Sequence, residues 1–337
     1  MDLDVLFIGT AGSAPTARRA LPATLVRRGG DRLLFDCGEG TQRQLLRSIG
    51  LIDLEEVFIT HFHADHFLGL PGMLKTFSLR GREAPITIYG PPGLRALFEV
   101  LQALVGRTVY EVRLVELQQN EELERDGYRI AAFEVNHRVR AFGYALVEDE
   151  RPGEFDPGAA ERLGVRPGPD FGRLQRGHTV DGVAPEQVMG PPRQGRKIVF
   201  SGDTVPCEAL AVAAHEADVL VHEATFSEEE ADRARETFHS TARQAAELAR
   251  GARARLLALT HISSRYAGGE VRDEARAVFA ATEAPRDFDT IEVPFPERGP
   301  AALVRWTGRH AGSGAEPRGP EEPPAEVPSA AETITAP

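Results

Sequence analysis

The sequence predicts an α/β fold, and three observations support this prediction. Short apolar runs of strand length, rich in β-branched and aromatic residues, recur along the 337-residue chain. Several of these runs end in a polar residue and lead into a helix-like pattern, first in one half of the chain and again in the other. Hydrophobic residues make up 42% and charged residues 27%, which is ordinary for a globular enzyme.

The expected elements alternate along the chain. Strands are expected at residues 3–8, 23–28, 32–35, 57–60, 86–89, 110–117, 128–136, 142–148, 197–200, 218–221 and 256–259, with short ones near Ile291 and Leu303. Helices are expected at about 41–47, 67–79, 94–104, 242–250 and 270–280. The strands at 23–28 and 32–35 are close enough to form a hairpin. Ser240 or Thr241 is the expected N-cap of the helix at 242–250.

Composition limits the location and partners of the protein. There is no apolar stretch of about 18 residues, so no membrane span is expected. The acidic start lacks the basic region of a signal peptide, and two cysteines do not make a disulfide framework, so a reducing cytoplasm is expected. The net charge of −12 taken alone argues against a nucleic-acid partner. A net charge does not, however, reveal bound cations or local basic patches.

Two segments differ from the predicted core at residues 1–310. Of the 47 residues at 151–197, 16 are Gly or Pro, and eight are Arg or Lys against six Asp or Glu. Composition alone leaves this insertion open to two interpretations, a solvated loop or a projecting arm that contacts phosphates. Residues 311–337 contain six prolines, five glutamates and no aromatic residue, and we expect them to form a disordered acidic tail.

Metal-ligating residues gather where predicted strands end. Residues 60–66 read Thr-His-Phe-His-Ala-Asp-His and join a strand to a helix. Alternation along an extended segment sends His61 and His63 to the same side, and Asp65 and His66 turn away as the helix begins. The loop therefore offers two ligand pairs for two neighbouring divalent metals, and imidazole with carboxylate suits zinc. A merely histidine-rich surface loop rarely has four such side chains so close together.

Three further candidates, His137, Asp203 and His261, also follow predicted strands. The seven candidate ligands are His61, His63, Asp65, His66, His137, Asp203 and His261. They divide into His61/His63/His137 and Asp65/His66/His261 with Asp203 bridging, and such three- to four-ligand sites keep the open positions of catalytic zinc. Two metals about 3.5–4 Å apart favour hydrolysis of a phosphodiester or another ester or amide. The ligand set alone does not distinguish among these substrate classes.

These ligands and several motifs resemble the ribonuclease Z family of the metallo-β-lactamase superfamily. The matching motifs lie at residues 35–39, 61–66, 89–91, 200–204, 222–225, 239–241 and 260–266. The resemblance covers residues 1–305 and implies a four-layer αβ/βα sandwich, two Zn²⁺ per subunit and a homodimer. It further implies a zinc-dependent endoribonuclease that removes the 3′ trailer from precursor tRNA, leaving a 3′-hydroxyl on the tRNA and a 5′-phosphate on the trailer.

The resemblance also implies roles for individual residues. Asp65 is both ligand and proton acceptor for the attacking water, while His239 with Glu223 delivers a proton to the leaving ribose oxygen. Arg166-Pro167-Gly168-Pro169 matches the Gly-Pro motif of the family's tRNA-binding arm, which favours the phosphate-contacting interpretation of residues 151–197. The expected RNA-binding residues are Arg166, Pro167, Gly168, Pro169, Arg173, Arg176 and Arg19. Arg19 lies in a loop at 15–20 where Pro15 and Arg19 match the family's 3′-end-sensing loop and Ala17 and Ala20 do not.

Two other functions remain alternatives. One is a hydrolase of the same superfamily that acts on a small phosphodiester, sulfate ester or lactone; such an enzyme does not need a basic Gly/Pro arm. The other is a non-catalytic RNA-binding module, which has no reason to keep seven metal ligands.

Overall fold

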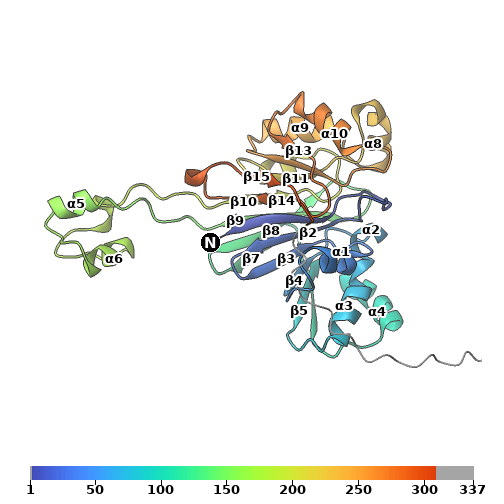
Figure 1. The fold of residues 1–337 in the computed structure, drawn as a ribbon, viewed down its shortest axis with the longest axis horizontal. Coiled ribbons are helices and arrows are strands. Elements are labelled where there is room, and N and C mark those ends of the chain that lie inside the picture. Colours follow the sequence, from blue (N-terminus) through green and yellow to red (C-terminus); the bar gives the residue numbers. More distant parts are fainter. Residues whose placement is uncertain (1, 309–337) are drawn as a thin grey trace, which may run out of the picture.

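Two β-sheets packed face to face form the centre of the molecule in the computed structural model, which describes residues 2–308 (Figure 1). The predicted tail at 311–337 lies outside the described residues. Within the described part, no helix is long and apolar enough to cross a lipid bilayer.

The first sheet has eight strands in the order β15-β14-β1-β2-β3-β4-β5-β6. Their bounds are β1 Leu3–Gly9, β2 Ala23–Arg28, β3 Asp31–Phe35, β4 Glu56–Phe58, β5 Ile86–Gly90, β6 Val112–Glu116, β14 Thr290–Glu292 and β15 Ala302–Val304. The hairpin expected between β2 and β3 is present, and pairing from β3 to β6 is parallel.

The second sheet has seven strands in the order β13-β12-β11-β10-β9-β8-β7. Their bounds are β7 Glu122–Arg125, β8 Tyr128–Val135, β9 Ala141–Glu148, β10 Lys197–Phe200, β11 Val219–Glu223, β12 Leu257–Thr260 and β13 Thr282–Glu283. Strands β10 to β13 are parallel, so their carboxyl ends share one edge of the sheet.

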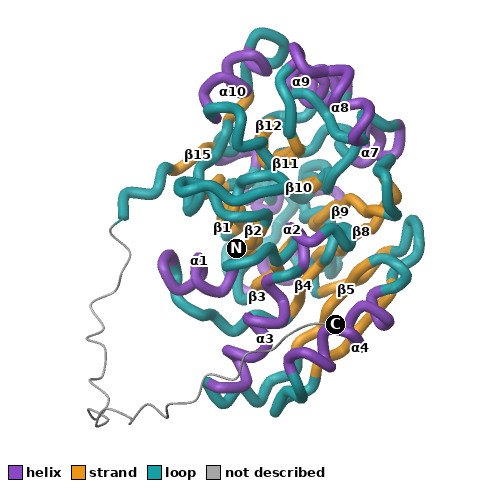
Figure 2. The backbone as a smooth tube through the Cα atoms, turned by 90° about the vertical axis from the view of Figure 1, so that its right-hand side faces the viewer, coloured by secondary structure: helices purple, strands orange, loops and turns teal. Residues whose placement is uncertain are grey.

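Helices cover the outer face of each sheet (Figure 2). The first sheet carries α1 Thr41–Ser48, α2 Ala64–Phe67, α3 Gly69–Leu79 and α4 Leu94–Val105, and the second carries α7 Glu208–Ala213, α8 Ala231–Thr237, α9 Ala242–Gly251 and α10 Gly268–Arg276. Thr241 caps α9, because its side chain accepts from Gln244 N. Short 3₁₀ turns lie at η1 Pro185–Gln187, η2 Glu228–Glu230 and η3 Pro296–Arg298.

Three apolar clusters define the four layers. The cluster between the sheets joins both of them, for example where the ring of Phe35 in β3 stacks on Phe200 in β10 at 4.1 Å. A second cluster packs the first sheet against α1, α3 and α4, and a third packs the other sheet against α7, α9 and α10. The predicted αβ/βα sandwich is therefore confirmed.

The sequence pattern missed β7, β13 and the four helices α5 to α8. Strand β7 reads Glu-Leu-Glu-Arg and is a half-exposed edge strand, so its only apolar signal is Leu123. Helix α8 reads Ala-Asp-Arg-Ala-Arg-Glu-Thr and buries only Ala234. Elements that bury so little have no apolar periodicity for a sequence pattern to detect.

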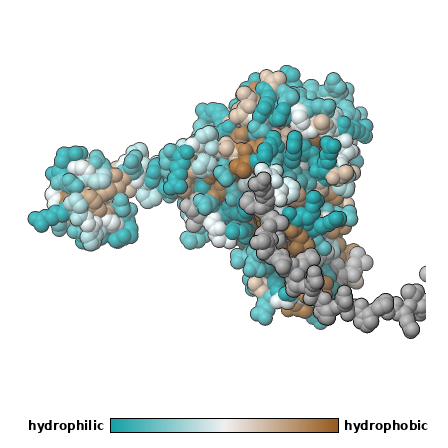
Figure 3. All heavy atoms as spheres, in the orientation of Figure 1, coloured by the Kyte–Doolittle hydropathy of each residue, from teal (hydrophilic) through white to brown (hydrophobic). Residues whose placement is uncertain are grey.

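The insertion between β9 and β10 projects from the sandwich on a narrow stalk (Figures 1 and 3). Two backbone bridges pair the stalk, Arg151 with Arg193 and Phe155 with Met189. The end of this projection contains α5 Pro157–Arg162, α6 Pro169–Gln175 and η1. Its buried residues are Ala160, Val165, Leu174, Val180, Val183 and Val188. This small separate core accounts for a lobe that folds away from the sheets.

A buried ion cluster holds the root of the stalk. Glu148, at the end of β9, accepts from Arg28 Nε at 2.8 Å and from Arg196 Nε and Nη2 at 2.7 and 2.8 Å. Arg196 is 1% exposed and also donates to Val293 O at 2.8 Å. Burial raises the pKa of Glu148, but the hydrogen bonds and charges of Arg196 and Arg28 outweigh burial and lower that pKa.

Glu148→Gln should destabilise the protein by about 3–5 kcal/mol, because it leaves two buried guanidinium groups without their carboxylate. The contribution of Glu148 is present above its unfolded pKa of about 4.3 and is lost as the pH falls through its lower folded value. Urea unfolding at pH 7 and at a series of pH values below 4 measures both effects. Glu111→Gln is the matched control, since Glu111 pairs with Arg113 on the open surface; an equal loss in both variants would contradict the role of burial.

Candidate metal centre and active site

The seven candidate ligands lie at one edge of the sandwich, where strands of both sheets end. His61 and His63 follow β4, and Asp65 and His66 lie in α2. From the second sheet, residues 137, 203 and 261 follow β8, β10 and β12. Residues up to 200 positions apart in the chain therefore meet because their strands end at the same edge.

The structure brings the seven side chains into the two predicted groups. In the first group, His63 Nδ1 lies 3.0 Å from His61 Nε2 and 3.2 Å from His137 Nε2. In the second, His261 Nε2 lies 3.3 Å from both His66 Nε2 and Asp65 Oδ2.

Asp203 connects the two groups. Its Oδ2 lies 3.7 Å from His61 Nε2 in the first group and 3.3 Å from the Nε2 atoms of both His66 and His261 in the second. The side chain is almost fully buried. This position fits the bridging role expected for Asp203, and the ligand role itself stays a prediction.

Outer hydrogen bonds fix which imidazole nitrogen faces the cluster. His66 Nδ1 donates to Asp36 Oδ2 at 2.7 Å, and His137 Nδ1 donates to the carbonyl of Phe238 at 2.8 Å. His261 Nδ1 donates to Thr225 Oγ1 at 2.8 Å, because that hydroxyl itself donates to Glu223. With Nδ1 held by these outer acceptors, Nε2 of each ring points inward, the orientation found in metal-binding histidines.

The protonation states of these groups also suit a metal. Burial, with neighbouring imidazoles, lowers the pKa of His61, His63 and His137, so these rings are neutral. Burial would raise the pKa of Asp203, but the charges of His261 and His66 hold it well below its usual range. Burial lowers the pKa of His66, but the charges of Asp203 and Asp36 outweigh burial and raise it. The inward nitrogens of the first group lie 3.0–3.2 Å apart. A cation satisfies such a donor set, so the residues fit divalent metals.

His239 and Glu223 form a buried pair beside the second group. His239 Nδ1 lies 2.8 Å from Glu223 Oε1, which also accepts from Thr204 N at 2.9 Å. Burial lowers the pKa of His239, but the charge and hydrogen bond of Glu223 outweigh burial and raise it to about 9. His239 could also complete a ligand group with Asp203 and His261. Its raised pKa keeps the ring protonated, however, whereas a metal ligand must be neutral, and this favours a proton carrier over a ligand.

Sequence reasoning gave no role to three residues that position the site. Asp36 holds His66 and also accepts from Thr60 N at 2.8 Å, with a positive φ of 59°. Thr225 joins Glu223 to His261, and Ser13 N donates to Asp65 Oδ2 at 2.9 Å. Asp36 could have been found, because it ends the predicted strand at 32–35. The contacts of Thr225 and Ser13 depend on chain segments brought together only by folding.

The expected RNA-binding residues do not lie together. Arg166, Pro167, Gly168, Pro169, Arg173 and Arg176 are exposed on the projection. The projection leaves from the end of β9 opposite to the metal-ligand edge, and the eight residues of β9 span about 26 Å. Arg19 is half-buried beside the ligand cluster, where its guanidinium donates to Thr10 Oγ1 at 2.6 Å and to Pro285 O at 3.1 Å.

Comparison with known proteins identifies the family. Residues 19–261 match the sequence profile of the metallo-beta-lactamase superfamily. A ribonuclease Z of Halorubrum lacusprofundi is 47% identical over 88% of this chain and 99% of its own length, and one of Myxococcus xanthus is 48% identical over 87% and 98%. The chain belongs to the ribonuclease Z family. The crystal structure of the short form of human tRNase Z is 30% identical, covers 86% of this chain and 99% of its own, and superposes with a TM-score of 0.62.

Family membership and the donor set together indicate a site for divalent metal. The fold alone would not indicate a metal site, because proteins of one fold differ in function. Here the converging nitrogens and carboxylates themselves fit a divalent cation.

Asp36→Asn should lower metal affinity by about 10–100-fold, since Asp36 holds the tautomer and orientation of His66. Competition with a chromogenic chelator measures this loss directly. Asp53→Asn is the control, because Asp53 is exposed and makes no side-chain hydrogen bond within residues 2–308. Unchanged affinity in the Asp36 variant would show that His66 needs no outer partner.

Proposed function

We propose that this protein is an endoribonuclease that removes the 3′ trailer from precursor tRNA. One observation carries the proposal: in a chain of the ribonuclease Z family, the two groups of candidate ligands, Asp203 and the His239–Glu223 pair all converge at one edge of the sandwich. A module that only binds RNA has no use for this set of groups.

The proposed cofactors are two Zn²⁺ ions per subunit. One would be held by His61, His63 and His137 and the other by Asp65, His66 and His261, with Asp203 between them. Imidazole-rich sites of three or four ligands favour zinc. When bound, such a pair of ions lowers the pKa of water and stabilises charge on the phosphate oxygens.

Asp65 is the proposed acceptor of the attacking water's proton. Burial raises its pKa, but the hydrogen bond from His261 and the charge of His66 outweigh burial, so the pKa lies below its usual range and the carboxylate stays ionised. Ser13 N–H donates to the same oxygen and fixes its orientation. The ionised carboxylate is the form that can accept a proton, and its fixed orientation, rather than its basicity, supports this role.

His239 is the proposed proton donor to the leaving oxygen. Glu223 accepts from Nδ1, which leaves Nε2–H of the imidazolium to protonate the ribose oxygen as the bond to phosphorus breaks. Water adds its oxygen to phosphorus, its proton goes to Asp65, and the P–O3′ bond breaks. The products are a tRNA 3′-hydroxyl and a trailer 5′-phosphate.

We further propose a homodimer in which the projection of one subunit serves the metal centre of its partner. The projection and the metal-ligand edge lie at opposite ends of β9 and β10. This separation supports a dimer in which each projection holds RNA for the partner's metal centre (action in trans) rather than for its own. The exposed guanidinium groups of Arg166, Arg173 and Arg176 suit contacts with tRNA phosphates. The free cysteines Cys37 and Cys207 agree with the cytoplasm as the expected location.

The function is tested by incubating purified protein and its His239→Ala variant with precursor tRNA, with and without a chelator. The parent should release a trailer with a 5′-phosphate, and the chelator should abolish release. Loss of general acid catalysis should slow the variant by about 10²–10⁴-fold. Elemental analysis should still find two zinc ions per chain. Lost metal in the variant would instead make His239 a ligand.

The trans arrangement is tested by replacing residues 152–192 with a short Gly/Ser linker, which retains the Arg151–Arg193 bridge and buried Arg196. Alone, this variant should hydrolyse a chromogenic phosphodiester but fail on precursor tRNA. Co-expression with full-length His239→Ala should restore up to about a quarter of the parent activity, since half of the dimers are mixed and each has one complete site. An inactive mixture would contradict service in trans. Full tRNA cleavage by the shortened variant alone would favour a small-substrate hydrolase.

A further inference from the structure

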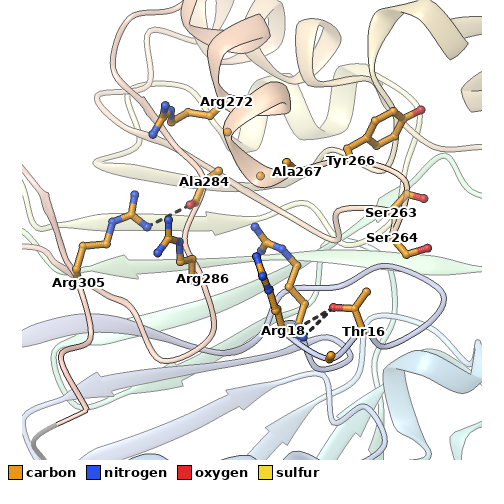
Figure 4. A pocket seen from close by; sticks show the side chains of 14 residues that line it. Thr16, Arg18, Ser263, Ser264, Tyr266, Ala267, Arg272, Ala284, Arg286 and Arg305 are labelled. Carbon is orange, nitrogen blue, oxygen red and sulfur yellow. Dashed lines mark hydrogen bonds between the residues drawn. The ribbon is translucent and has the colours of Figure 1, made fainter.

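Arginines gather at three places on this acidic protein. Those of the projection are exposed, and a second set lines a cavity of about 590 Å³ beside the metal centre, which we call the arginine pocket (Figure 4). The arginine pocket contains Arg18, Arg19, Arg272, Arg286 and Arg305. The third set, Arg151, Arg193 and Arg196, lies at the root of the stalk and contacts the segment at residues 293–298, which follows β14. This third set therefore joins the projection to the sandwich.

The ring of Phe295 lies between two of these guanidinium groups. Arg151 Cζ is 3.6 Å from the ring centroid, and Arg196 Cζ is 4.0 Å from it. Two guanidinium groups this close to one centroid cannot share a face of the ring, so they lie on opposite faces, and each is attracted by the ring's negative face. Arg196 is held in turn by the carboxylate of Glu148. The stack therefore ties Arg151, in the outgoing strand of the stalk, to the buried ion cluster.

The carboxylate of Glu297 contacts both strands of the stalk. Arg151 donates from Nη1 to Oε1 at 2.7 Å and from Nη2 to Oε2 at 3.0 Å, a two-point contact that fixes the orientation of both groups. Arg193 Nη1 donates to Oε1 at 3.4 Å. Arg151 and Arg193 form the first backbone bridge, so one carboxylate holds the two strands where they leave the sandwich. The hydrogen bond from Arg151 lowers the pKa of Glu297 to about 2, which keeps the carboxylate ionised.

The two strands of the stalk act as one unit, because they remain paired beyond this point. Asp156 N donates to Val188 O at 2.7 Å. Gly153 packs directly on the backbone of Gly190, where a Cβ atom would collide. The direction of the projection is thus set at its root. The residues from Arg151 to the start of α5 span up to about 20 Å, so a tilt of about 10° at the root would move α5 by up to about 3.5 Å.

We propose that Phe295 and Glu297 are positioning residues that fix the direction of the projection, and with it the place where bound tRNA meets a metal centre. This rests on the proposed function, in which the projection holds tRNA and the metal centre cuts it. Both residues follow a strand of the first sheet, whereas the stalk is an insertion in the second. Their contacts therefore brace the stalk from outside its own sheet, at the end of β9 that is far from the metal ligands.

Motion of the projection tests the proposal without RNA. A fluorophore on Glu161→Cys, at an exposed position of α5, reports rotation of the projection through time-resolved anisotropy. Cys207→Ser removes the other accessible thiol, since Cys37 is buried. In the parent, the label should rotate with the whole protein. Phe295→Leu/Glu297→Gln should add a faster component, and Phe295→Tyr, which keeps the ring, should not. A parent-like decay in the double variant would overturn the proposal.

The matched control is Glu292→Gln, which removes an exposed carboxylate at the end of β14, just before the same segment. Within residues 2–308, this carboxylate accepts no hydrogen bond and pairs with no basic side chain. The control should match the parent in every measurement, which separates the contacts of Glu297 from a general change of charge.

Cleavage of precursor tRNA supplies the second test. In the double variant, kcat should fall by about 10–100-fold, since misplacing reacting groups by about 1 Å can cost about 10²-fold. KM should stay within about twofold of the parent value, because the exposed arginines of the projection are unchanged. Hydrolysis of a chromogenic phosphodiester should keep the parent rate. Unchanged kcat, with or without a rise in KM, would overturn the positioning role. If the parent cuts no precursor tRNA, the proposed function fails, while the anisotropy result still decides whether these two residues hold the projection.

Discussion

The crowding of imidazole nitrogens and carboxylates at one edge of the sandwich is the constraint on which the rest of this structure depends. Three imidazole nitrogens approach one another within 3.2 Å in the first group, and Asp203 Oδ2 meets two more at 3.3 Å in the second. These groups are desolvated, which is costly in a buried site unless opposite charges or cations offset the cost. The fold must therefore hold them together against their mutual repulsion.

The rigidity needed for this comes from the core between the sheets and from strained backbone at the site. Stacked rings of Phe35, Phe58 and Phe200 set the spacing of strands that carry ligands on opposite sheets. Asp36 and His261 adopt positive φ values of 59° and 54°, which place their side chains toward the cluster. Such conformations persist only where surrounding packing enforces them, and they concentrate at functional sites.

Charge is distributed so that RNA is attracted locally by a protein that is acidic overall. The projection has its own small core and exposes arginines, while the arginine pocket gathers others beside the metal centre. The ion cluster of Glu148, Arg28 and Arg196 anchors the stalk without adding charge to the surface. Two basic surfaces separated by the length of a sheet suit a long, bent, polyanionic substrate better than a small ester.

The sequence by itself determined the class of fold, most strands and the seven candidate ligands, because apolar periodicity and polar residues at strand ends are local signals. It missed β7 and α8, which bury almost nothing. Only the tertiary structure decided which nitrogen of each ring faces inward, that Thr225 and Ser13 hold catalytic candidates, and that Arg18 and Arg286 share a pocket with Arg272 and Arg305. Those contacts join residues far apart in the chain, and such pairings leave no local pattern in a single sequence.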